Sequence, residues 1–574
     1  MSNDKRIFSP PTLPVGINDF RRIIENKLDF VDKSLLVKMI IESGDEVILI
    51  ARPRRFGKTL NMSMLQHFFA AEVDGKSTKG LFDNLKITQT ETYLQHQGKY
   101  PVIFLTFKDV RGLSFESTQK ELVNVMSKLY RRHYEVLDSD SLIEEEKNVF
   151  RSILSQTASK EVVWRALREL TEYLYRYYGK EPIVLIDEYD TPIHSGYAQK
   201  YYKEIVECMR SVLSPALKDN PYIHKAVLTG IMRVSKESLF TGLNNIKVYS
   251  ILAPQYSEYF GFTEEEVQQL LVRQGREDLS EDIKNWYNGY LMGDTVIYNP
   301  WSIVNCLVDK GVLKPYWVNT SDNALIRDLL AKTSEDFKSQ FELLLQEKTV
   351  EKSIDENIVF SDLQANEEVI WSLLLMSGYL KIVDHQMTDW GIVYKLGIPN
   401  QEVRDLYRNI IIKYWLSSDY LQYDQFLKSL IQGNIAEFIK HLNKIMLQTA
   451  STYDMAKEPE AFYHGLMLGL LASLNPRHYE IKSNRETGFG RYDIMVIPKE
   501  STRLGILLEV KNIEKPTGKQ DIDLLLQIEA KKGLNQIKER QYSAELEQRN
   551  IGQILQIGLA FCGKRFKMEH EMKG

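Results

Sequence analysis

The chain has 574 residues, enough for several domains with separate hydrophobic cores, and 43% of its residues are hydrophobic while 26% are charged. This balance is typical of folded soluble proteins and excludes a disordered or fibrous chain. The formal net charge of −5 excludes a uniformly basic nucleic-acid binder, although it allows a local basic groove.

Features of secretion and membrane insertion are missing from the sequence pattern. Cys208, Cys306 and Cys562 are scattered, so they form neither a metal-binding spacing nor a disulfide framework. The start, residues 1–6, lacks the apolar segment of a signal peptide. The apolar run at 466–474 is too short to span a bilayer. We therefore expect a cytoplasmic protein without a membrane partner.

The first chemical motif follows an apolar run at residues 47–51, which predicts a strand buried on both faces. A turn-like segment then leads to Gly57, Lys58 and Thr59, and a helical pattern follows. Strand, loop and helix in this order are the context of a phosphate-binding loop. Lys58 is expected to reach the β- and γ-phosphates of a nucleotide, and the Thr59 hydroxyl to bind Mg²⁺. Arg52 replaces the first glycine of the usual pattern, so the motif needs support from other segments.

Support comes from a second apolar strand at 182–186, which ends in Asp187 and Glu188. An aspartate at the tip of such a strand can hold Mg²⁺ through its water shell, and the next glutamate can polarise an attacking water. Without these acids, residues 57–59 would be equally compatible with an ordinary helix start. Strand and motif together predict a nucleotide site.

A further buried strand, 225–230, carries Thr229 near its end, where ATPases place a sensor of the γ-phosphate. Arg233 could stabilise transition-state charge in its own site or in a neighbouring subunit's, which allows a homo-oligomer. A turn threonine and a surface arginine are an equally compatible alternative.

Strands and helices alternate along this part of the chain, with a strand at 100–107 and a helix at 115–136, and this pattern predicts a parallel sheet covered on both faces. No Asn-Lys-x-Asp segment is present to recognise guanine, so ATP is favoured over GTP.

Several segments together resemble the bacterial AAA-ATPase-like family. They are Arg52–Thr59, Leu185–Asp190 and Leu228–Gly230, with further matches at Leu239–Asn245, Trp286–Tyr290 and Tyr298–Trp301. The resemblance covers roughly the first 320 residues, and an arginine in place of the first glycine is usual for this family. It implies a P-loop ATPase whose loop binds nucleotide through Arg52, Pro53, Arg54, Arg55, Phe56, Gly57, Lys58 and Thr59.

The middle of the chain shows a helix, hairpin and helix pattern that is similar to a winged helix. Such modules bind DNA, serve as ATPase lids or dock proteins, and the sequence does not decide among these. The predicted segments are 369–376 (helix), 379–383 and 392–396 (strands), 384–391 (a polar tip between the strands), 400–415 (helix) and 426–447 (a further helix).

A second set of acids lies near the C-terminus. Predicted strands at 492–497 and 504–511 place Asp493 and Glu509 on neighbouring strands, with Lys511 on the same face as Glu509. Two carboxylates and the Val510 carbonyl offer an oxygen site for Mg²⁺ or Mn²⁺. Lys511 can orient an attacking water and offset charge at a phosphodiester. By itself the pattern is weak, because such residues are common on solvent-facing strands.

The segment Gly488–Lys511 resembles the PD-(D/E)XK nuclease domain that commonly follows this ATPase-like domain. The resemblance implies metal-dependent cleavage of nucleic acid, with DNA favoured. It also implies a helix at 530–544 in which Gln536 contacts the scissile phosphate or the water, while Glu460 is a weaker candidate for a helical acid. From Arg477 onward the chain has 18 basic and 14 acidic residues, and this small basic excess is compatible with a phosphate-binding groove.

The chain is therefore predicted to be an α/β multidomain protein. We expect a P-loop NTPase parallel sheet with a helical lid, a winged-helix-like middle region, and a small mixed-sheet PD-(D/E)XK nuclease-like domain. The expected boundaries are 1–235 (ATPase core), 236–330 (lid), 331–455 (middle region) and 456–574 (nuclease-like domain). Two alternatives remain: a nucleotide-switched regulator acting through the winged helix, or a nuclease-fold domain that binds DNA without cleaving it.

Overall fold

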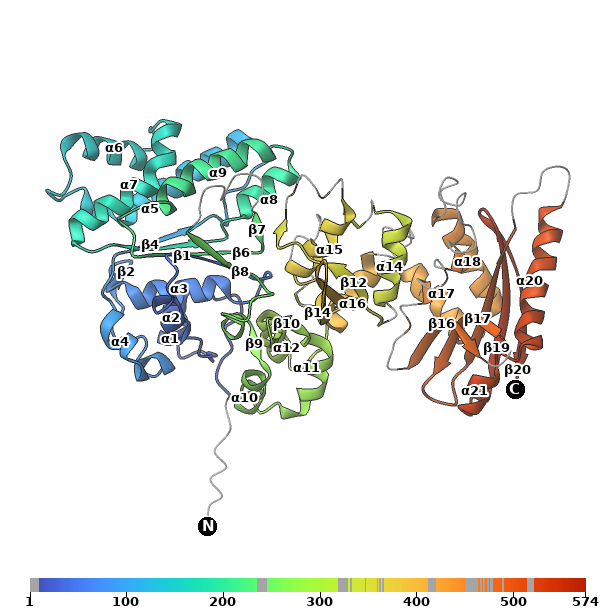
Figure 1. Ribbon diagram of the computed structural model, residues 1–574. Coiled ribbons are helices and arrows are strands. Elements are labelled where there is room, and N and C mark those ends of the chain that lie inside the picture. The colour runs from blue at the N-terminus through green and yellow to red at the C-terminus, as the bar shows by residue number, and fades with distance from the viewer. Residues whose placement is uncertain are drawn as a thin grey trace, which may run out of the picture. The chain divides into compact units, whose positions relative to one another are not determined.

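The computed structural model divides into two compact units (Figure 1). Unit 1 consists of residues 1–325 and 351–403, and unit 2 of residues 326–350 and 404–574. The predicted middle region is thus shared between the units, and the four domain boundaries stay a prediction. The structure describes residues 10–234, 245–317, 329–330, 333–345, 347–358, 360, 363, 366–410, 420–449, 463–464, 467, 470–471, 474, 478–487, 490–513 and 521–574.

A five-stranded parallel sheet forms the centre of unit 1, with the strand order β4-β5-β6-β1-β8. Strands β1, β5 and β6 are buried along their whole length, as their continuous apolar runs predict. Strand β8 brings residues beyond the expected boundary at 235 into this sheet. The strands are β1 (Val47–Ala51), β4 (Val102–Thr106), β5 (Ile183–Asp187), β6 (Lys225–Gly230) and β8 (Ile246–Tyr249).

Helices cover both faces of this sheet (Figure 1). On one face lie α1 (Phe20–Glu25), α2 (Leu36–Ile41), α3 (Lys58–Phe69) and α4 (Glu91–His96). On the other lie α5 (Phe115–Arg132), α6 (Glu144–Leu154), α7 (Lys160–Tyr178), α8 (Thr191–Ala198) and α9 (Tyr202–Leu217). The doubly covered parallel sheet is confirmed. The helix expected over 115–136 ends at Arg132, and a 3₁₀ turn occupies Tyr134–Val136.

A small subdomain follows the last strand of the sheet; we call it the lid region, and its role as a lid stays a prediction. Its antiparallel strands have the order β10-β11-β9, and its core includes Tyr287 and Tyr298, both completely buried. The aromatic stretch between these tyrosines therefore supplies packing. The elements are β9 (Phe262–Thr263), α10 (Glu264–Gln274), α11 (Ser280–Tyr287), β10 (Tyr290–Met292), β11 (Thr295–Tyr298) and α12 (Pro300–Val308).

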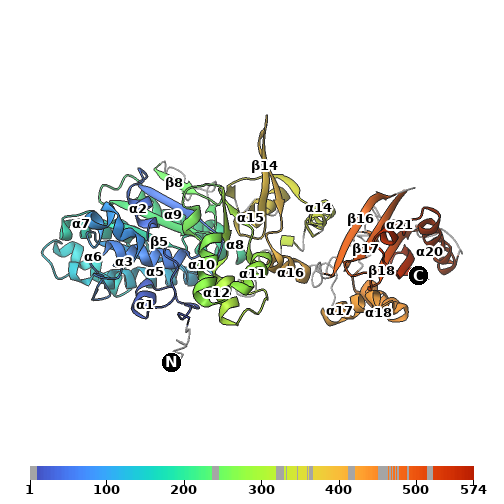
Figure 2. The same ribbon diagram turned by 90° about the horizontal axis from the view of Figure 1, so that it is seen from below.

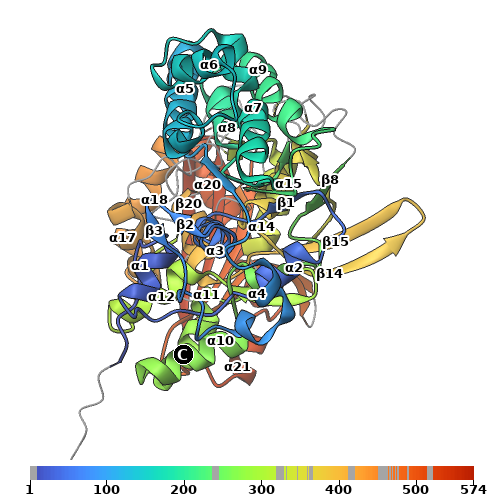
Figure 3. The same ribbon diagram turned by 90° about the vertical axis from the view of Figure 1, so that its left-hand side faces the viewer.

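The helix, hairpin and helix order of the middle region is confirmed, but its polar tip is not. Residues 384–388 continue strand β14, and Asp389 and Trp390 form the turn before Gly391, whose φ is +121°. Antiparallel pairing satisfies the backbone hydrogen-bonding groups of residues 384–388 whatever side chains they carry. Both faces of this hairpin are largely exposed, so polar side chains do not end the strand. The hairpin projects from unit 1 (Figures 2 and 3). The elements are β12 (Val350–Ser353), β13 (Asn357–Ile358, paired with β7, Arg233–Val234), α15 (Glu367–Met376), β14 (Lys381–Thr388), β15 (Gly391–Gly397) and α16 (Gln401–Ile410).

Unit 2 contains a mixed sheet with the order β16-β17-β18-β19-β20, in which the β18–β19 pair alone among these four pairings is parallel. Helix α20 packs on β18 and β19. The helix expected over 426–447 is two helices, because Gly433 adopts a φ of +69° between them. The helix expected over 530–544 begins earlier, at an Asp521 cap, and ends at Glu539. The elements are α14 (Glu335–Leu345), α17 (Tyr420–Ile431), α18 (Ile435–Thr449), β16 (Tyr479–Thr487), β17 (Gly490–Pro498), β18 (Gly505–Asn512), α20 (Ile522–Glu539), α21 (Ala544–Gln548), β19 (Ile554–Cys562) and β20 (Arg565–Lys573).

Candidate functional site

The loop between β1 and α3 ends in a helix start that is suited to an anion. Gly57 precedes α3 in the left-handed conformation, with a φ of +83°, and it has no side chain to cap the helix. The first amides of the twelve-residue helix are therefore open to an external acceptor, and the helix dipole favours negative charge there. Phosphate oxygens of a nucleotide fit this end of α3.

Lys58 is held inside this loop. Its Nζ donates to the carbonyl oxygens of Arg52, at 2.9 Å, and Pro53, at 2.8 Å. Burial lowers the pKa of Lys58, and the neighbouring Glu188, Asp190 and Asp187 oppose that shift. The two carbonyls thus hold the ammonium against the loop.

Asp187, at the end of β5, contacts the start of α3 and the end of β6. The Thr59 hydroxyl donates to its Oδ2 at 2.7 Å, and the Thr229 hydroxyl donates to its Oδ1 at 2.6 Å. Strand β6 lies between β1 and β5, so the parallel strands bring Asp187, Thr229 and the helix start that follows β1 to the same end of the sheet. Thr59 and Asp187 are the two residues expected to bind Mg²⁺, and the structure brings them into contact.

Glu188 leaves the line of β5 through a strained backbone. Its φ is +53°, a conformation that a residue with a side chain adopts at a cost of about 1 kcal/mol or more. Burial raises the pKa of Glu188, the adjacent Asp187 raises it further, and Lys58 opposes both. A hydrogen bond from Thr191 to Oε2, at 3.2 Å, orients the carboxylate. A base with a raised pKa beside Asp187 is suited to accept a proton from water.

The arginines of the loop take different positions. Arg52 is completely buried, and its guanidinium donates to the carbonyls of Tyr249, Ser250 and Gln255 after β8. Burial lowers its pKa to about 9, which leaves it charged at neutral pH. The Arg52 side chain thus ties the loop to the sheet edge, and contact between it and a nucleotide stays a prediction.

The outer part of the loop packs against lid aromatics. The Arg55 guanidinium lies 4.2 Å from the centre of the Trp301 ring, and the Phe56 ring meets Tyr290 edge-on at 5.0 Å. The Trp317 indole donates to the Arg54 carbonyl at 3.1 Å. The sequence did not predict these contacts between the loop and the lid region. The aromatic residues concentrated at 286–301 were the available signal.

Arg233 lies in the short strand β7, which pairs with β13. Its action on phosphate charge stays a prediction.

The sequence motif around Asp187 also contains Tyr189 and Asp190, for which the sequence predicted no role. In the structure, both contact the chain segment between Thr229 and Arg233. Their place directly after Glu188 was the available signal.

In unit 2, the register of β17 and β18 brings the second set of acids together. Ile494 pairs with Leu508, and Asp493 and Glu509 are the next residues on the two antiparallel strands. The backbone amide of Val510 donates to Asp493 Oδ2 at 2.7 Å, which fixes the aspartate against β18. His464 contacts the Asp493 carbonyl through Nε2 at 3.2 Å. The predicted placement of Asp493 and Glu509 on neighbouring strands is confirmed.

Glu509 is the buried centre of this second set, with 1% of its surface exposed. Lys511 Nζ donates to Glu509 Oε1 at 3.0 Å, and the Gln536 amide from α20 donates to the same oxygen. Burial raises the pKa of Glu509 to about 7, Asp493 contributes to the rise, and Lys511 opposes it. Two predicted residues, Lys511 and Gln536, thus contact the predicted acid directly.

The donor set fits a hard divalent cation at one particular atom. Glu509 Oε2 is buried and has no hydrogen-bond partner among the described residues. A buried acceptor of this kind is costly unless something satisfies it, and Asp493 adds a second carboxylate beside it. Across the described part of the chain, no group of three or more His, Cys, Asp or Glu residues offers a metal site. Any cation here would thus depend on two carboxylates, with the Val510 carbonyl as the predicted third ligand.

Some predicted positions lie outside the described residues. They are Glu460, the residues 235–244 that hold most of the Leu239–Asn245 match, and Gly488 and Phe489 before β17.

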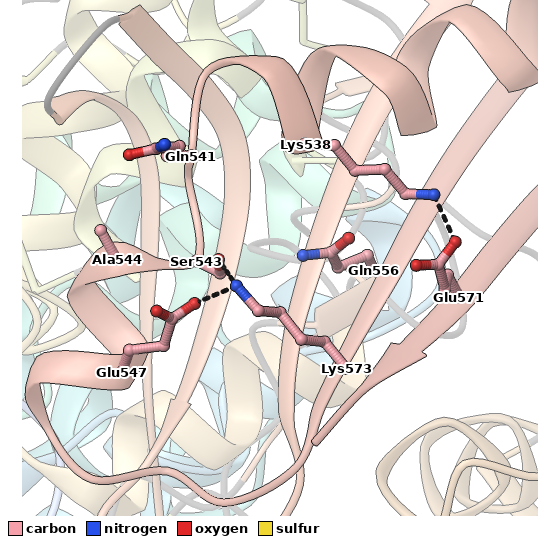
Figure 4. Close-up of a pocket in the computed structure, with 8 residues that line it drawn as sticks. All are labelled: Lys538, Gln541, Ser543, Ala544, Glu547, Gln556, Glu571 and Lys573. Carbon is pink, nitrogen blue, oxygen red and sulfur yellow. Dashed lines mark hydrogen bonds and ion pairs between the residues drawn. The ribbon is translucent and has the colours of Figure 1, made fainter.

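A separate pocket of about 450 Å³ opens where the end of α20 meets α21 and strand β20 (Figure 4). Lys573 bonds to Ser543 and Glu547, and Lys538 bonds to Glu571 across it. Each lysine is thus neutralised by an acid within the pocket. The predicted acids Asp493 and Glu509 are not among its lining residues.

Comparisons with known proteins give a family match for each of the two regions that contain the predicted site residues. Residues 14–240 match the family described as "Predicted AAA-ATPase", and residues 458–571 match the "PD-(D/E)XK nuclease superfamily". A protein of Azotobacter chroococcum mcd 1, described as "Uncharacterized protein in vnfD 5'region", is 25% identical over 496 residues, covering 84% of this chain and 87% of that protein.

The ORC2 protein of Aeropyrum pernix, solved in ADPNP–ADP complexes, aligns with 71% of this chain and 97% of its own at 10% identity. Its TM-score is 0.23, too low to carry a structural argument. Within the described residues, no helix combines the length and apolarity needed to cross a membrane. The chain thus has one region, residues 14–240, that matches the predicted AAA-ATPase family, and a second, residues 458–571, that matches the PD-(D/E)XK nuclease superfamily.

Proposed function

We propose that this protein binds and hydrolyses ATP, and that its C-terminal domain is a metal-dependent nuclease for which DNA is the favoured substrate. One observation carries the ATPase proposal: Asp187 accepts hydrogen bonds from both Thr59 and Thr229. A helix-start hydroxyl, a strand-end acid and a sensor hydroxyl at one sheet edge are the parts that phosphoryl transfer needs.

Each residue of the ATPase site then has a distinct task. The amides at the start of α3 and the Lys58 ammonium bind the phosphates. Thr59 and Asp187 hold Mg²⁺, which when bound neutralises charge on the phosphate oxygens. Glu188 accepts a proton from water, and its raised pKa brings it closer to working pH. Thr229 senses the γ-phosphate in this proposal, and its hydrogen bond to Asp187 supports that role.

In the nuclease site, Asp493 and Glu509 hold the cation, which when bound supplies Lewis-acid stabilisation at the scissile phosphate. Lys511 orients the attacking water and offsets negative charge on the phosphate. Gln536 fixes the Glu509 carboxylate from the side of α20. The buried Glu509 Oε2 without a partner among described residues supports a cation there, which favours cleavage over simple binding.

One experiment separates these alternatives. Purified protein is mixed with single- and double-stranded DNA and RNA, with Mg²⁺, Mn²⁺ or a chelator, and with or without ATP. We expect metal-dependent cleavage that Lys511→Ala abolishes, and ATP hydrolysis that Lys58→Ala abolishes. DNA binding without cleavage under every metal condition would favour a binding module, and ATP turnover unchanged in Lys58→Ala would overturn the ATPase.

A further inference from the structure

The two residues after Glu188 hold a particular segment of the proposed ATPase site. Asp190 Oδ2 accepts from the backbone amides of Ile231, at 2.7 Å, and Met232, at 3.4 Å. The Tyr189 hydroxyl donates to the Met232 carbonyl at 2.6 Å. These bonds grip Gly230–Met232, which we call the clamped segment.

Asp190 bonds to the clamped segment rather than capping its own helix. Asp190 immediately precedes α8, where an aspartate ordinarily accepts from an amide of its own helix, yet its side chain makes no such bond. It is instead 1% exposed and directed at the clamped segment. Burial would raise its pKa, but hydrogen bonding from His194, 3.3 Å away, and the Ile231 amide lowers it overall. The carboxylate is therefore charged, and its bonds to the amides are strong.

The Tyr189 and Asp190 side chains also pack directly against the backbone of Gly230. A Cβ at Gly230 would lie 2.5 Å from Tyr189 Cε1 and 3.0 Å from Asp190 Cγ, so these side chains meet the backbone where glycine leaves room. Two backbone bonds flank the contact: the Tyr189 amide donates to the Thr229 carbonyl at 3.1 Å, and the Arg52 amide donates to the Gly230 carbonyl at 3.0 Å. The clamped segment is thus fixed between Thr229, which contacts Asp187, and Arg233.

We infer that Tyr189 and Asp190 are positioning residues of the ATPase, which hold the clamped segment so that Thr229 stays against Asp187 and Arg233 extends from a fixed point. The inference rests on the proposed ATP hydrolysis and adds residues that act through Thr229 and Arg233. Because neither residue is proposed to touch nucleotide, their loss should lower kcat. Removal of the uncharged Tyr189 hydroxyl should also leave nucleotide affinity nearly unchanged, whereas the Asp190 charge acts on the neighbouring Lys58.

Tyr189→Phe tests this with a matched control. Tyr130 is also completely buried, and its hydroxyl donates to the Ala166 carbonyl at 2.8 Å within the helical layer. Tyr130→Phe should therefore lose similar stability without touching the site. We expect Tyr189→Phe to reduce kcat for ATP by about fivefold or more, with the Kd for ADP within about twofold of wild type. A kcat equal to that of Tyr130→Phe would overturn the inference.

Asp190 variants provide a graded second measurement. Asn keeps an acceptor oxygen for the Ile231 amide whereas Ala removes it, so kcat should fall in the order wild type, Asp190→Asn, Asp190→Ala. Hydrogen exchange at Ile231 and Met232 should speed up in Asp190→Ala, and unchanged exchange there would also contradict the inference. Should Asp190→Ala fail to fold, the Tyr189→Phe comparison decides.

Lys58→Ala distinguishes failure of the proposed ATPase from failure of the positioning role of Tyr189 and Asp190. If it abolishes hydrolysis while Tyr189→Phe matches Tyr130→Phe, the ATPase stands and the clamp is wrong. If Lys58→Ala hydrolyses ATP like wild type, the proposed function and the clamp both fall.

Discussion

The Thr59 hydroxyl donates a 2.7 Å hydrogen bond to the Asp187 carboxylate, although the two residues lie 128 positions apart in the sequence. The bond joins the start of α3 to the tip of β5. An unbonded Asp187, 1% exposed, would carry a large desolvation cost, so Thr59 and Thr229 offset that cost while fixing the acid. The proposed Mg²⁺ ligands are therefore held in place by the fold itself.

Lys58→Ala should abolish ATP binding, because the Lys58 ammonium is held against the loop that leads to the first amides of α3. Lys225 offers a matched control: it is also buried, and its Nζ donates to the Ser43 carbonyl at 2.7 Å, at the opposite end of β6. Titration with a fluorescent ATP analogue should show no binding to Lys58→Ala and ordinary binding to Lys225→Ala. Equal loss in both variants would point to destabilisation and count against a phosphate-binding Lys58.

Glu188→Gln should bind ATP and hydrolyse it slowly, because the amide cannot accept a proton from water. We expect kcat to drop by about 100-fold or more with little change in affinity, in line with the loss of a general base. Single-turnover hydrolysis and equilibrium binding measure the two quantities separately. Ordinary turnover in this variant would remove Glu188 from the mechanism.

Thr229→Val should lower turnover, since it removes the 2.6 Å bond to Asp187 while keeping the side-chain shape. Thr171→Val is the control: Thr171 is equally buried and donates to the Arg168 carbonyl at 2.6 Å in α7. Both should cost about 1 kcal/mol of unfolding free energy. Only Thr229→Val should reduce kcat, and a similar reduction in both would show that stability alone is responsible.

Glu509→Gln should weaken Mn²⁺ binding in nucleotide-free protein, because the variant lacks the buried negative charge. Titration calorimetry should detect a Mn²⁺ site in wild type that is about tenfold weaker or missing in the variant. Glu402→Gln is the control, since Glu402 is a buried carboxylate bonded to Ser302 and the Trp317 amide. Wild-type Mn²⁺ binding by Glu509→Gln would leave the nuclease proposal without its metal.

Lys511→Ala should leave ATP hydrolysis largely intact, whereas Lys58→Ala should change nucleic-acid cleavage by at least several-fold. This result is expected if nucleotide state controls access to the nuclease site, for which ATP and ADP must differ in affinity for two arrangements of the chain. Cleavage rates with Mg²⁺ are compared for wild type and both variants, with and without ATP. Cleavage indifferent to ATP and to Lys58 would mean two independent enzymes in one chain.

Local sequence determined the chemistry-bearing turns and the strands that end in them. Continuous apolar runs predicted β1, β5 and β6, because a strand covered on both faces needs apolar side chains at every position. Alternation of strands and helices predicted the parallel sheet. In unit 2, strand periodicity placed Lys511 on the face of Glu509, and a 3.0 Å contact agrees.

Tertiary structure decided which of these residues meet. The order of strands put β6 between β1 and β5, and no local pattern encodes such an order because it depends on long-range pairing. The bond from Gln536 to Glu509 depends on how α20 docks. The start of α20 at Asp521 has a local signal, an aspartate that caps the helix, but the predicted helix at 530–544 did not use it. Arg52 and Asp190 show the limit most clearly. The sequence predicted a nucleotide contact for Arg52 and no role for Asp190, and the folded sheet alone shows that both side chains are buried against backbone groups.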